Sequence, residues 1–204
     1  MLSKIIKNLN LSSLETQRLI LRPMRLKDIP KIFEMRNKKF VHSMMRSNEE
    51  LNYNAYIKWF KKRKNRLDYV IINKKNKKII GVISIIFHFK NNIFYSELCK
   101  YIGHKSYHGK GLGLEATKEW INFIFTSLNI KYIFAQTLKE NYSNIKLNKK
   151  IGFNMLKNKN NILTKSKWKV MTFTRGKWLK QNPEILRNIY YFDLKKILSW
   201  RNSL

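Results

Sequence analysis

The sequence predicts an α/β fold, a single domain whose mixed sheet of about seven strands is flanked by helices and followed by a helical C-terminal tail. A folded core is expected because 204 residues with 44% hydrophobic and 13% aromatic content are typical of a globular domain. Three apolar runs separated by short polar turns predict an antiparallel meander. A helical segment then joins the last of these runs to a further strand, and such a crossover makes those two strands parallel.

The first part of the chain predicts one strand and two helices. Apolar residues alternate with others in 18–24, which is typical of a strand with one buried face. After Asp28 the apolar residues recur at spacings of three and four, and Pro30 falls in the first turn, where proline is tolerated. The same spacing in 48–64 predicts a second helix.

The rest of the chain predicts strands and helices in alternation. Asn91-Asn92 is a turn signal between two apolar runs, and Gly152 is a C-cap glycine at the end of a helix. The strands are expected at 69–72, 79–87, 93–102, 131–137, from Phe153 onward and at 168–174, and the helices at 112–127, 142–150 and 182–200. The expected parts are an N-terminal arm at 1–14, the domain at 15–180 and a helical extension at 181–204.

The net charge is +31, from 43 Lys and Arg against 12 Asp and Glu. Such a charge predicts a partner that is polyanionic, such as the ribosome or RNA. The many Asn and Ile residues support another interpretation, in which AT-rich codons have drawn surface positions toward Lys and Asn. Both interpretations predict that anionic ligands are attracted at low salt.

Several classes of protein are excluded or disfavoured by composition. The single cysteine, Cys99, rules out an internal disulfide, and four scattered histidines have no metal-ligand spacing, so no metal is expected. No run approaches the roughly 18 apolar residues that cross a bilayer. The first residues also lack the apolar core of a secretory signal, and we therefore expect a cytoplasmic protein without a membrane span.

A glycine-rich basic segment runs directly into the helix expected at 112–127. This segment, His108-Gly-Lys-Gly-Leu-Gly113, is called the glycine loop below. Its glycines let the backbone turn sharply and direct successive N–H groups to one place. The first turn of the helix adds free N–H groups and the positive end of its dipole. The glycine loop therefore predicts a site for a phosphate or pyrophosphate, and it lies where the sheet changes strand direction.

Two motifs in this order resemble the GNAT superfamily of acetyl-coenzyme A-dependent N-acetyltransferases. The glycine loop is similar to the superfamily's Gln/Arg-x-x-Gly-x-Gly/Ala pyrophosphate loop, and Asn141 to Phe153 resembles its Asn-x-x-Ser-Ile-x-x-x-x-Lys-x-Gly-Phe segment. The opening, Leu14-Glu-Thr-Gln-Arg-Leu-Ile-Leu-Arg-Pro, is similar to the subgroup that acetylates the N-termini of ribosomal proteins. The resemblance runs from about 15 to 178.

The resemblance implies acetyl-coenzyme A as acetyl donor and assigns residues to it. Backbone groups of the glycine loop would hold the pyrophosphate, with Lys110 adding charge, and Asn141 would contact the pantetheine arm. Main-chain groups of Tyr101 to Gly103, where the family's strand bulges and splays from the next one, would pair with the pantetheine and the acetyl carbonyl. The implied coenzyme-binding residues are Tyr101, Ile102, Gly103, His108, Gly109, Lys110, Gly111, Leu112, Gly113 and Asn141.

The chain departs from the superfamily's pattern at three positions. His108 stands for the usual Gln or Arg, and Asn144 stands where the subgroup commonly has Ser. Many members have a Tyr seven residues after the Asn, as general acid for the leaving thiolate, and this chain has Asn148 there. The subgroup often lacks that Tyr too, so the departure indicates a subgroup.

Acetyl transfer to an amine needs a group that accepts the amine proton and one that protonates the leaving sulfur. Among few acidic residues, Glu97 on the strand that enters the coenzyme site is the candidate base, with a surface or salt-bridged glutamate as the alternative. Tyr142 is the candidate acid, Tyr107 is a second candidate, and packing is the alternative role for both. Glu115, in the first turn of a helix, and Cys99, on a strand, are expected to be structural.

Two other groups of residues remain, the scattered histidines and the candidate lining of the acceptor side. His42, His88 and His104 have no evident partner in the sequence and are expected at the surface or in loops. The acceptor side is expected between the first two helices. Its candidate lining, for which helical packing is the alternative role, is Arg36, Asn37, Met44, Met45, Arg46 and Trp59.

Three functions are open at this point. The first is acetylation of a protein N-terminal α-amine, with a ribosomal protein as the expected acceptor. The second is acetylation of a nucleotide-linked amino sugar, because Met35-Arg-Asn37 and Ile57-Lys-Trp-Phe60 resemble segments of acetyltransferases of flagellin glycan synthesis. The third is a non-catalytic, basic RNA-binding protein on an acetyltransferase scaffold.

Overall fold

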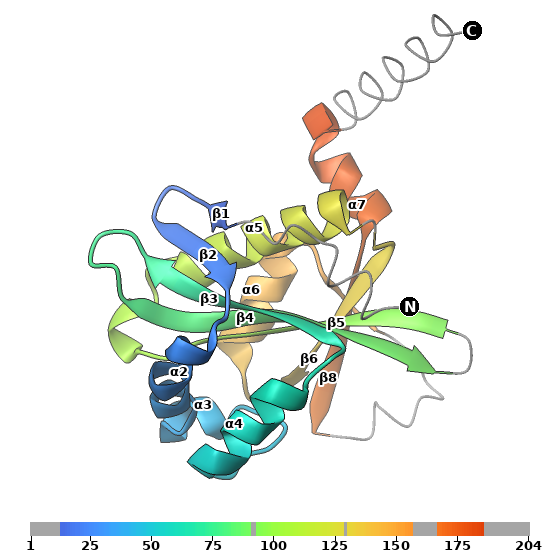
Figure 1. Ribbon diagram of the computed structural model, residues 1–204. Helices are drawn as coiled ribbons and strands as arrows, with labels where there is room; N and C mark the ends of the chain where they lie inside the picture. Colours follow the sequence, from blue (N-terminus) through green and yellow to red (C-terminus); the bar gives the residue numbers. More distant parts are fainter. Residues whose placement is uncertain (1–12, 91–92, 129, 157–166, 186–204) are drawn as a thin grey trace, which may run out of the picture.

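The structure is a computed structural model that describes residues 13–90, 93–128, 130–156 and 167–185. One mixed sheet of eight strands runs through it in the order β1-β2-β3-β4-β5-β6-β8-β7 (Figure 1). The strands are β1 (Leu14–Glu15), β2 (Leu19–Pro23), β3 (Arg66–Asn73), β4 (Ile79–Lys90), β5 (Ile93–Ile102), β6 (Tyr132–Leu138), β7 (Asn154–Met155) and β8 (Trp168–Thr174). The α/β class and the mixed sheet are thereby confirmed.

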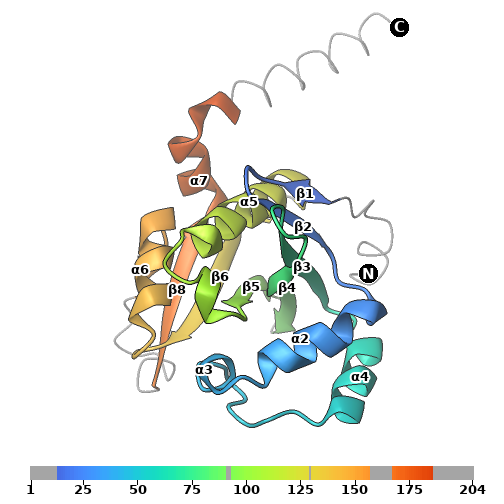
Figure 2. The same ribbon diagram turned by 90° about the vertical axis from the view of Figure 1, so that its left-hand side faces the viewer.

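Helices cover both faces of the sheet (Figures 1 and 2). The helices and 3-10 turns are η1 (Leu26–Asp28), α2 (Ile29–Arg36), α3 (Lys39–His42), α4 (Tyr53–Lys62), η2 (Lys105–Tyr107), α5 (Leu112–Ser127), α6 (Tyr142–Ile151) and α7 (Arg175–Gln181). The larger core lies on the α5 face, where Trp120 and Phe125 of α5 are fully buried together with apolar residues of α6, α7 and the strands. A smaller core on the opposite face packs α2 against β3 and β4.

The expected meander is confirmed, because β3, β4 and β5 pair antiparallel in sequence. The helix at 112–127 is confirmed with the same bounds, and the next strand is parallel to β5 as expected. Gly152 ends α6 with a left-handed φ of 119°, which agrees with its expected role as a C-cap.

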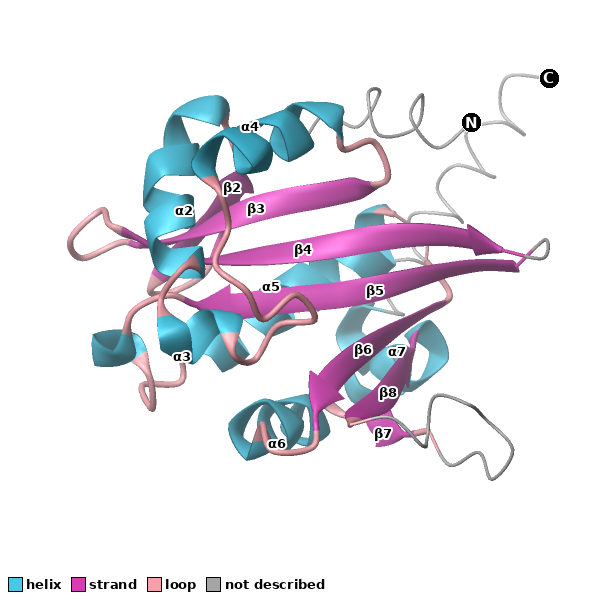
Figure 3. Cartoon of the chain, turned by 90° about the horizontal axis from the view of Figure 1, so that it is seen from below, coloured by secondary structure: helices cyan, strands magenta, loops and turns pink. Residues whose placement is uncertain are grey.

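The contact between β5 and β6 is short. Only two residue pairs join them, Ser96 with Ile133 and Glu97 with Phe134. Beyond Glu97 the two strands diverge toward their C-terminal ends (Figure 3). We call the space between the diverging ends the strand opening. The expected splay is therefore confirmed, whereas β5 keeps one register with β4 through all its pairs, so the implied bulge is absent from that pairing.

The described chain differs from the expected elements at several places. β1, α3 and α7 were not expected, and the helix expected at 48–64 begins only at Tyr53. Its start is set by Asn52, whose side chain caps α4 by accepting from the Ala55 N–H at 3.1 Å. Most of the helix expected at 182–200, and the arm at 1–12, lie outside the described residues.

No helix within the described ranges is long and apolar enough to cross a membrane. The same ranges hold no group of three or more His, Cys, Asp or Glu side chains that is arranged to bind a metal ion.

Candidate active site

The glycine loop ends in the open first turn of α5. Gly109 and Gly111 adopt left-handed φ angles of 73° and 76°, which favour glycine. The bond from the Glu115 N–H to the Gly111 carbonyl, at 3.0 Å, starts the hydrogen-bond ladder of α5. Consequently the N–H groups of Leu112, Gly113 and Leu114 precede the ladder and are available to an anion.

The outer side of the glycine loop has room for a ligand. A Cβ added at Gly109 would meet no atom within 4 Å, and Lys110 beside it is exposed. The His108 ring turns back, with Nε2 3.1 Å from the Ile102 carbonyl oxygen. The loop therefore has donors, positive charge and open space, which fit the pyrophosphate of coenzyme A.

Glu115 and Arg18 support the glycine loop from the other side. Glu115 accepts from the Thr16 hydroxyl at 2.6 Å and from the Arg18 Nε at 2.7 Å, and Arg18 Nη1 donates to the Lys110 carbonyl at 2.9 Å. Burial alone would raise the pKa of Glu115, but the hydrogen bonds from Thr16 and Arg18 lower it below the usual value. Glu115 therefore joins the segment before β2 to the loop, in agreement with the structural role expected for it.

The end of β5 presents main-chain groups to the strand opening. Gly103 donates its N–H to the Ile80 carbonyl at 2.8 Å, toward β4. Main-chain groups alternate in direction along an antiparallel ladder. The N–H and carbonyl of Tyr101 therefore also point toward β4, whereas those of Ile102 point toward the strand opening. Gly103 is packed closely, since an added Cβ would lie 2.5 Å from the Met35 sulfur, and its carbonyl accepts from Lys38 Nζ at 3.3 Å. Of the three positions predicted for pantetheine, Ile102 is the one whose main chain lies at the open edge.

Glu97 lies at the point where β5 and β6 separate. It is 4% exposed, and its carboxylate accepts from Arg46 Nη2 at 2.7 Å, with His88 Nε2 at 3.2 Å from its other oxygen. Arg46 also donates to Gln136 Oε1 at 2.8 Å, so the guanidinium links β5 to β6. The expectation that His88 has no partner is wrong, because β4 and β5 bring it diagonally across the ladder from Glu97. His42 and His104 likewise lie within hydrogen-bond distance of Asn48 and Lys38.

The other predicted residues lie around α6 and the loop before α5. Tyr142 is 76% exposed in the first turn of α6. Asn141 caps α6, since its Oδ1 accepts from the Asn144 N–H at 3.1 Å, which leaves its amide nitrogen as the group able to donate to a ligand. The Tyr107 hydroxyl accepts from Asn76 Nδ2 at 2.6 Å. Burial raises the pKa of Cys99 to about 12, which makes it a neutral thiol and agrees with a packing role.

A family model described as an acetyltransferase (GNAT) domain matches residues 18–154, more than half of the chain. The chain belongs to the GNAT acetyltransferase family. Its members transfer an acetyl group from acetyl-coenzyme A, and the expected enzyme class is thereby confirmed. No curated protein matches the acetyltransferase in sequence.

Solved structures share the fold of this acetyltransferase. Spermidine N-acetyltransferase from Vibrio cholerae, in complex with CoA and spermine, has a TM-score of 0.67 at 19% identity, covering 80% of this chain and 99% of its own. A GNAT-family acetyltransferase from Bacillus anthracis has a TM-score of 0.66 at 16% identity, covering 81% and 99%. A domain from Methanocaldococcus jannaschii DSM 2661 has a TM-score of 0.66 at 19% identity, covering 80% and 99%. Identities this low show a common fold alone.

The acetyltransferase has unpaired polar groups on the face that carries α2 and α4. Arg36 Nη1 and the Tyr101 hydroxyl are buried without a hydrogen-bond partner in the described structure. Burial lowers the pKa of Arg36 and raises that of Tyr101 well above its usual value. Trp59, of the predicted acceptor lining, is 40% exposed and stacks on Tyr56 with ring centroids 5.1 Å apart.

Three residues of the site carry interactions that sequence reasoning did not find. Arg46 was considered for the acceptor lining, but its bonds to both diverging strands were not expected. Arg18 holds the glycine loop. Lys100 has no role in the prediction from sequence, and its Nζ donates to Asn148 Oδ1 on α6 at 2.8 Å. A lysine between apolar residues of a buried strand is the sequence signal that would have identified it.

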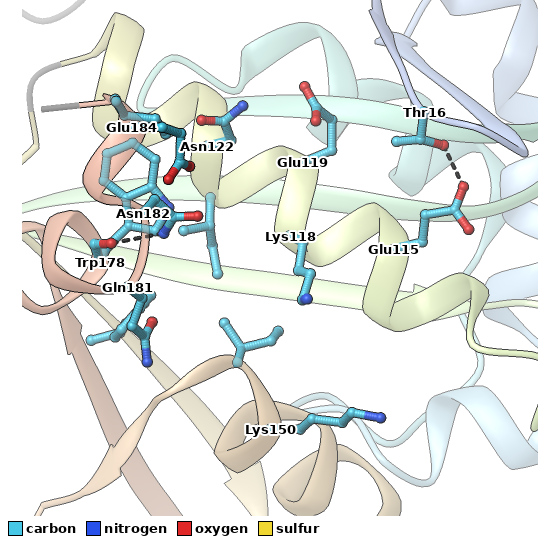
Figure 4. Close-up of a pocket in the computed structure, with 14 residues that line it drawn as sticks. Thr16, Glu115, Lys118, Glu119, Asn122, Lys150, Trp178, Gln181, Asn182 and Glu184 are labelled. Atoms are coloured by element: carbon cyan, nitrogen blue, oxygen red, sulfur yellow. Dashed lines mark hydrogen bonds between the residues drawn. The ribbon is translucent and has the colours of Figure 1, made fainter. Parts of the chain in front are cut away.

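A cavity of about 680 Å³ lies elsewhere on the acetyltransferase, beside α5 and α7 (Figure 4). It is lined partly by Glu115, Lys118 and Glu119 of α5 and by Trp178 of α7. None of the residues predicted for catalysis or for coenzyme A lines it. The cavity is therefore separate from the glycine loop and the strand opening.

Proposed function

We propose that this acetyltransferase acetylates the N-terminal α-amine of a protein, with a ribosomal protein as the first acceptor to test. The observation that carries the proposal is the buried carboxylate of Glu97 where β5 and β6 separate, on the strand that leads to the glycine loop. Coenzyme A bound through its pyrophosphate at the glycine loop supplies the acetyl thioester. The main chain of Ile102 and the amide of Asn141 then orient the pantetheine arm, and Glu97 accepts the proton of the attacking amine.

The protonation state of the acceptor favours an α-amine. Glu97 is held by Arg46 Nη2 at 2.7 Å, which fixes its carboxylate where the two strands separate. An α-amino group has a pKa of about 7.7–8.0 against about 10.4 for a lysine side chain, so more of it is neutral at physiological pH. Such an acceptor therefore demands less of the residue that accepts its proton. The similarity of the segment from Leu14 to Pro23 to the ribosomal-protein subgroup supports the same acceptor.

A nucleotide-linked amino sugar is the second candidate acceptor. Its support is the pair of buried, unpartnered groups on the α2 and α4 face, Arg36 Nη1 and the Tyr101 hydroxyl. A guanidinium and a phenol both donate to phosphate oxygens. A polyamine such as spermidine is disfavoured, because Arg36 and a net charge of +31 repel a polycation.

The acceptor is tested by incubating the protein with acetyl-coenzyme A and one acceptor at a time, while release of the coenzyme thiol is followed. The acceptors are N-terminal peptides of ribosomal proteins, the same peptides with blocked N-termini, an amino-sugar nucleotide and spermidine. We expect thiol release with the free N-terminal peptides alone. Release with the sugar nucleotide alone would select the second candidate instead.

Glu97→Gln tests the role of the carboxylate. The substitution keeps the shape of the side chain and removes its charge, so we expect kcat to fall by roughly 10²-fold or more. Glu119→Gln is the matched control, because Glu119 is a partly buried glutamate on α5 that lines the separate cavity. An unchanged rate and pH profile in the Glu97 variant would remove Glu97 as the base.

A further inference from the structure

Lys100 occupies the strand opening on the side of α5 and α6. It lies on β5 beyond Glu97, the last residue paired with β6, and its Nζ reaches Asn148 Oδ1 on α6 at 2.8 Å. Its neighbours on the same face of β5, Leu98 and Ile102, pack into the core that α5 and α6 share. The lysine side chain therefore spans from β5 to α6. Leu147, next to Asn148 on α6, would lie 3.4 Å from a Cβ added at Gly113 in the first turn of α5.

The charge of Lys100 has no counter-ion within the described ranges. No carboxylate forms an ion pair with it, and Asn148, its hydrogen-bond partner, is neutral and fully buried. The titratable group that acts on it electrostatically is Cys99 on the same strand, and burial keeps that thiol neutral. Placing a cation in such surroundings costs stability. A fold that needed only packing here would use an apolar residue.

We propose that Lys100 is the proton donor to the sulfur of coenzyme A during acetyl transfer. The inference rests on the proposed function, because it assigns a further residue to the same reaction. The attacking amine forms a bond to the acetyl carbon, and the carbon–sulfur bond breaks with its electron pair on sulfur. The Lys100 ammonium gives one proton to that sulfur and becomes a neutral amine, while Glu97 accepts the proton that the attacking nitrogen loses. Exchange with water returns both groups to their starting states.

The acid strength of Lys100 suits this step. Burial lowers its pKa from 10.5 to about 8. A thiol has a pKa of about 8.5, so the donor and the acceptor of the proton are nearly matched. A proton donor works best when its pKa lies near the working pH, and an ordinary lysine would hold its proton too strongly. Asn148, where the superfamily's tyrosine is expected, has no transferable proton.

The first test is a titration of the thiol of bound coenzyme A, followed by thiolate absorbance, because it requires no acceptor. A cation next to the sulfur stabilises the thiolate, so we expect a lower thiol pKa in the parent complex than in the Lys100→Met complex. Lys118→Met is the matched control, since Lys118 is exposed on α5, and its complex should titrate like the parent. Identical titrations of the parent and Lys100→Met complexes would overturn the role of Lys100 and leave the proposed function intact. Failure of the parent to bind coenzyme A would overturn both.

The second test is the pH dependence of acetyl transfer. The parent rate should fall as pH rises past about 8, where Lys100 loses its proton. Lys100→Met should lower kcat by roughly 10²-fold and lose this alkaline limb, with little change in KM for acetyl-coenzyme A. Lys100→Arg keeps the charge but not the acidity, so it should retain the lowered thiol pKa while kcat stays low. Full kcat in the Met variant, or a retained alkaline limb, contradicts proton donation.

Discussion

At the residue scale, Lys100 should reduce the stability of the fold at neutral pH. Its pKa is about 8 in the folded chain and 10.5 in the unfolded one, so between these values the folded chain binds fewer protons and stability rises with pH. Below pH 8 both states are charged, and the folded state carries the full cost of burying the cation. Lys100→Met should therefore raise the free energy of unfolding at pH 7 by about 1 kcal/mol, after the loss of the Asn148 hydrogen bond is subtracted.

The measurement is urea unfolding of the parent and the variant from pH 7 to pH 10.5. We expect the advantage of Lys100→Met to shrink as pH passes from 8 toward 10.5, because the folded lysine is already neutral there while the unfolded lysine still holds its proton. A variant that is less stable than the parent at pH 7 would show that Lys100 is there for stability. A gain in stability together with a loss of activity is the pattern of a functional residue.

Roles that depend on residues close in sequence were predictable, and roles that depend on residues distant in sequence were not. The glycine loop belongs to one strand-to-helix turn, so local geometry sufficed for it. Arg46 and Glu97 are 51 positions apart, and Lys100 and Asn148 are 48 apart. The face of β5 that each side chain occupies depends on the register of the strand. A shift of one residue exchanges the two faces, and the sequence does not determine this register.

At the element scale, a substitution where the glycine loop joins α5 should abolish ligand binding without unfolding the protein. Gly111 has a φ of 76°, and a β-branched residue is strained there by roughly 1–2 kcal/mol. Gly111→Val should thus distort the first turn of α5 and abolish coenzyme A binding, while circular dichroism stays that of a folded protein. Gly176→Val is the control, since Gly176 has open space around it and an ordinary φ. Retained coenzyme affinity in the Gly111 variant would exclude the loop as the pyrophosphate site.

Long elements were predicted well because they repeat their pattern several times. The helix α5 and the strands β4 and β5 each carry enough apolar residues to set a period. β1 and α3 have two and four residues, which is too few for a period to be seen. The late start of α4 follows from contacts across the loop before it, where Asn37 of the α2 C-cap bonds both the N–H and the carbonyl of Leu51.

At the scale of the whole molecule, the excess of basic residues determines how the protein binds polyanions. Several of the 12 acidic residues are already paired within the fold, among them Asp28 with Arg22, Asp68 with Arg63 and Arg66, and Glu115 with Arg18. Most of the 43 basic residues are therefore left to act on surrounding anions, and they are spread over the length of the chain. Such a distribution favours binding that is strong at low salt and has no sequence preference.

We expect binding to a single-stranded RNA to weaken by roughly 10³-fold between 50 and 200 mM salt, because counterions released on binding dominate its affinity. Coenzyme A should lose much less affinity over the same range, since backbone N–H groups of the glycine loop hold it at short range. Fluorescence anisotropy with a labelled RNA and calorimetry with coenzyme A measure the two trends on one sample. Tight, salt-resistant RNA binding without coenzyme A binding would instead favour an RNA-binding protein on this scaffold. The expected pair of trends means that the positive charge attracts anions in general. Specificity for the acceptor then resides in the strand opening.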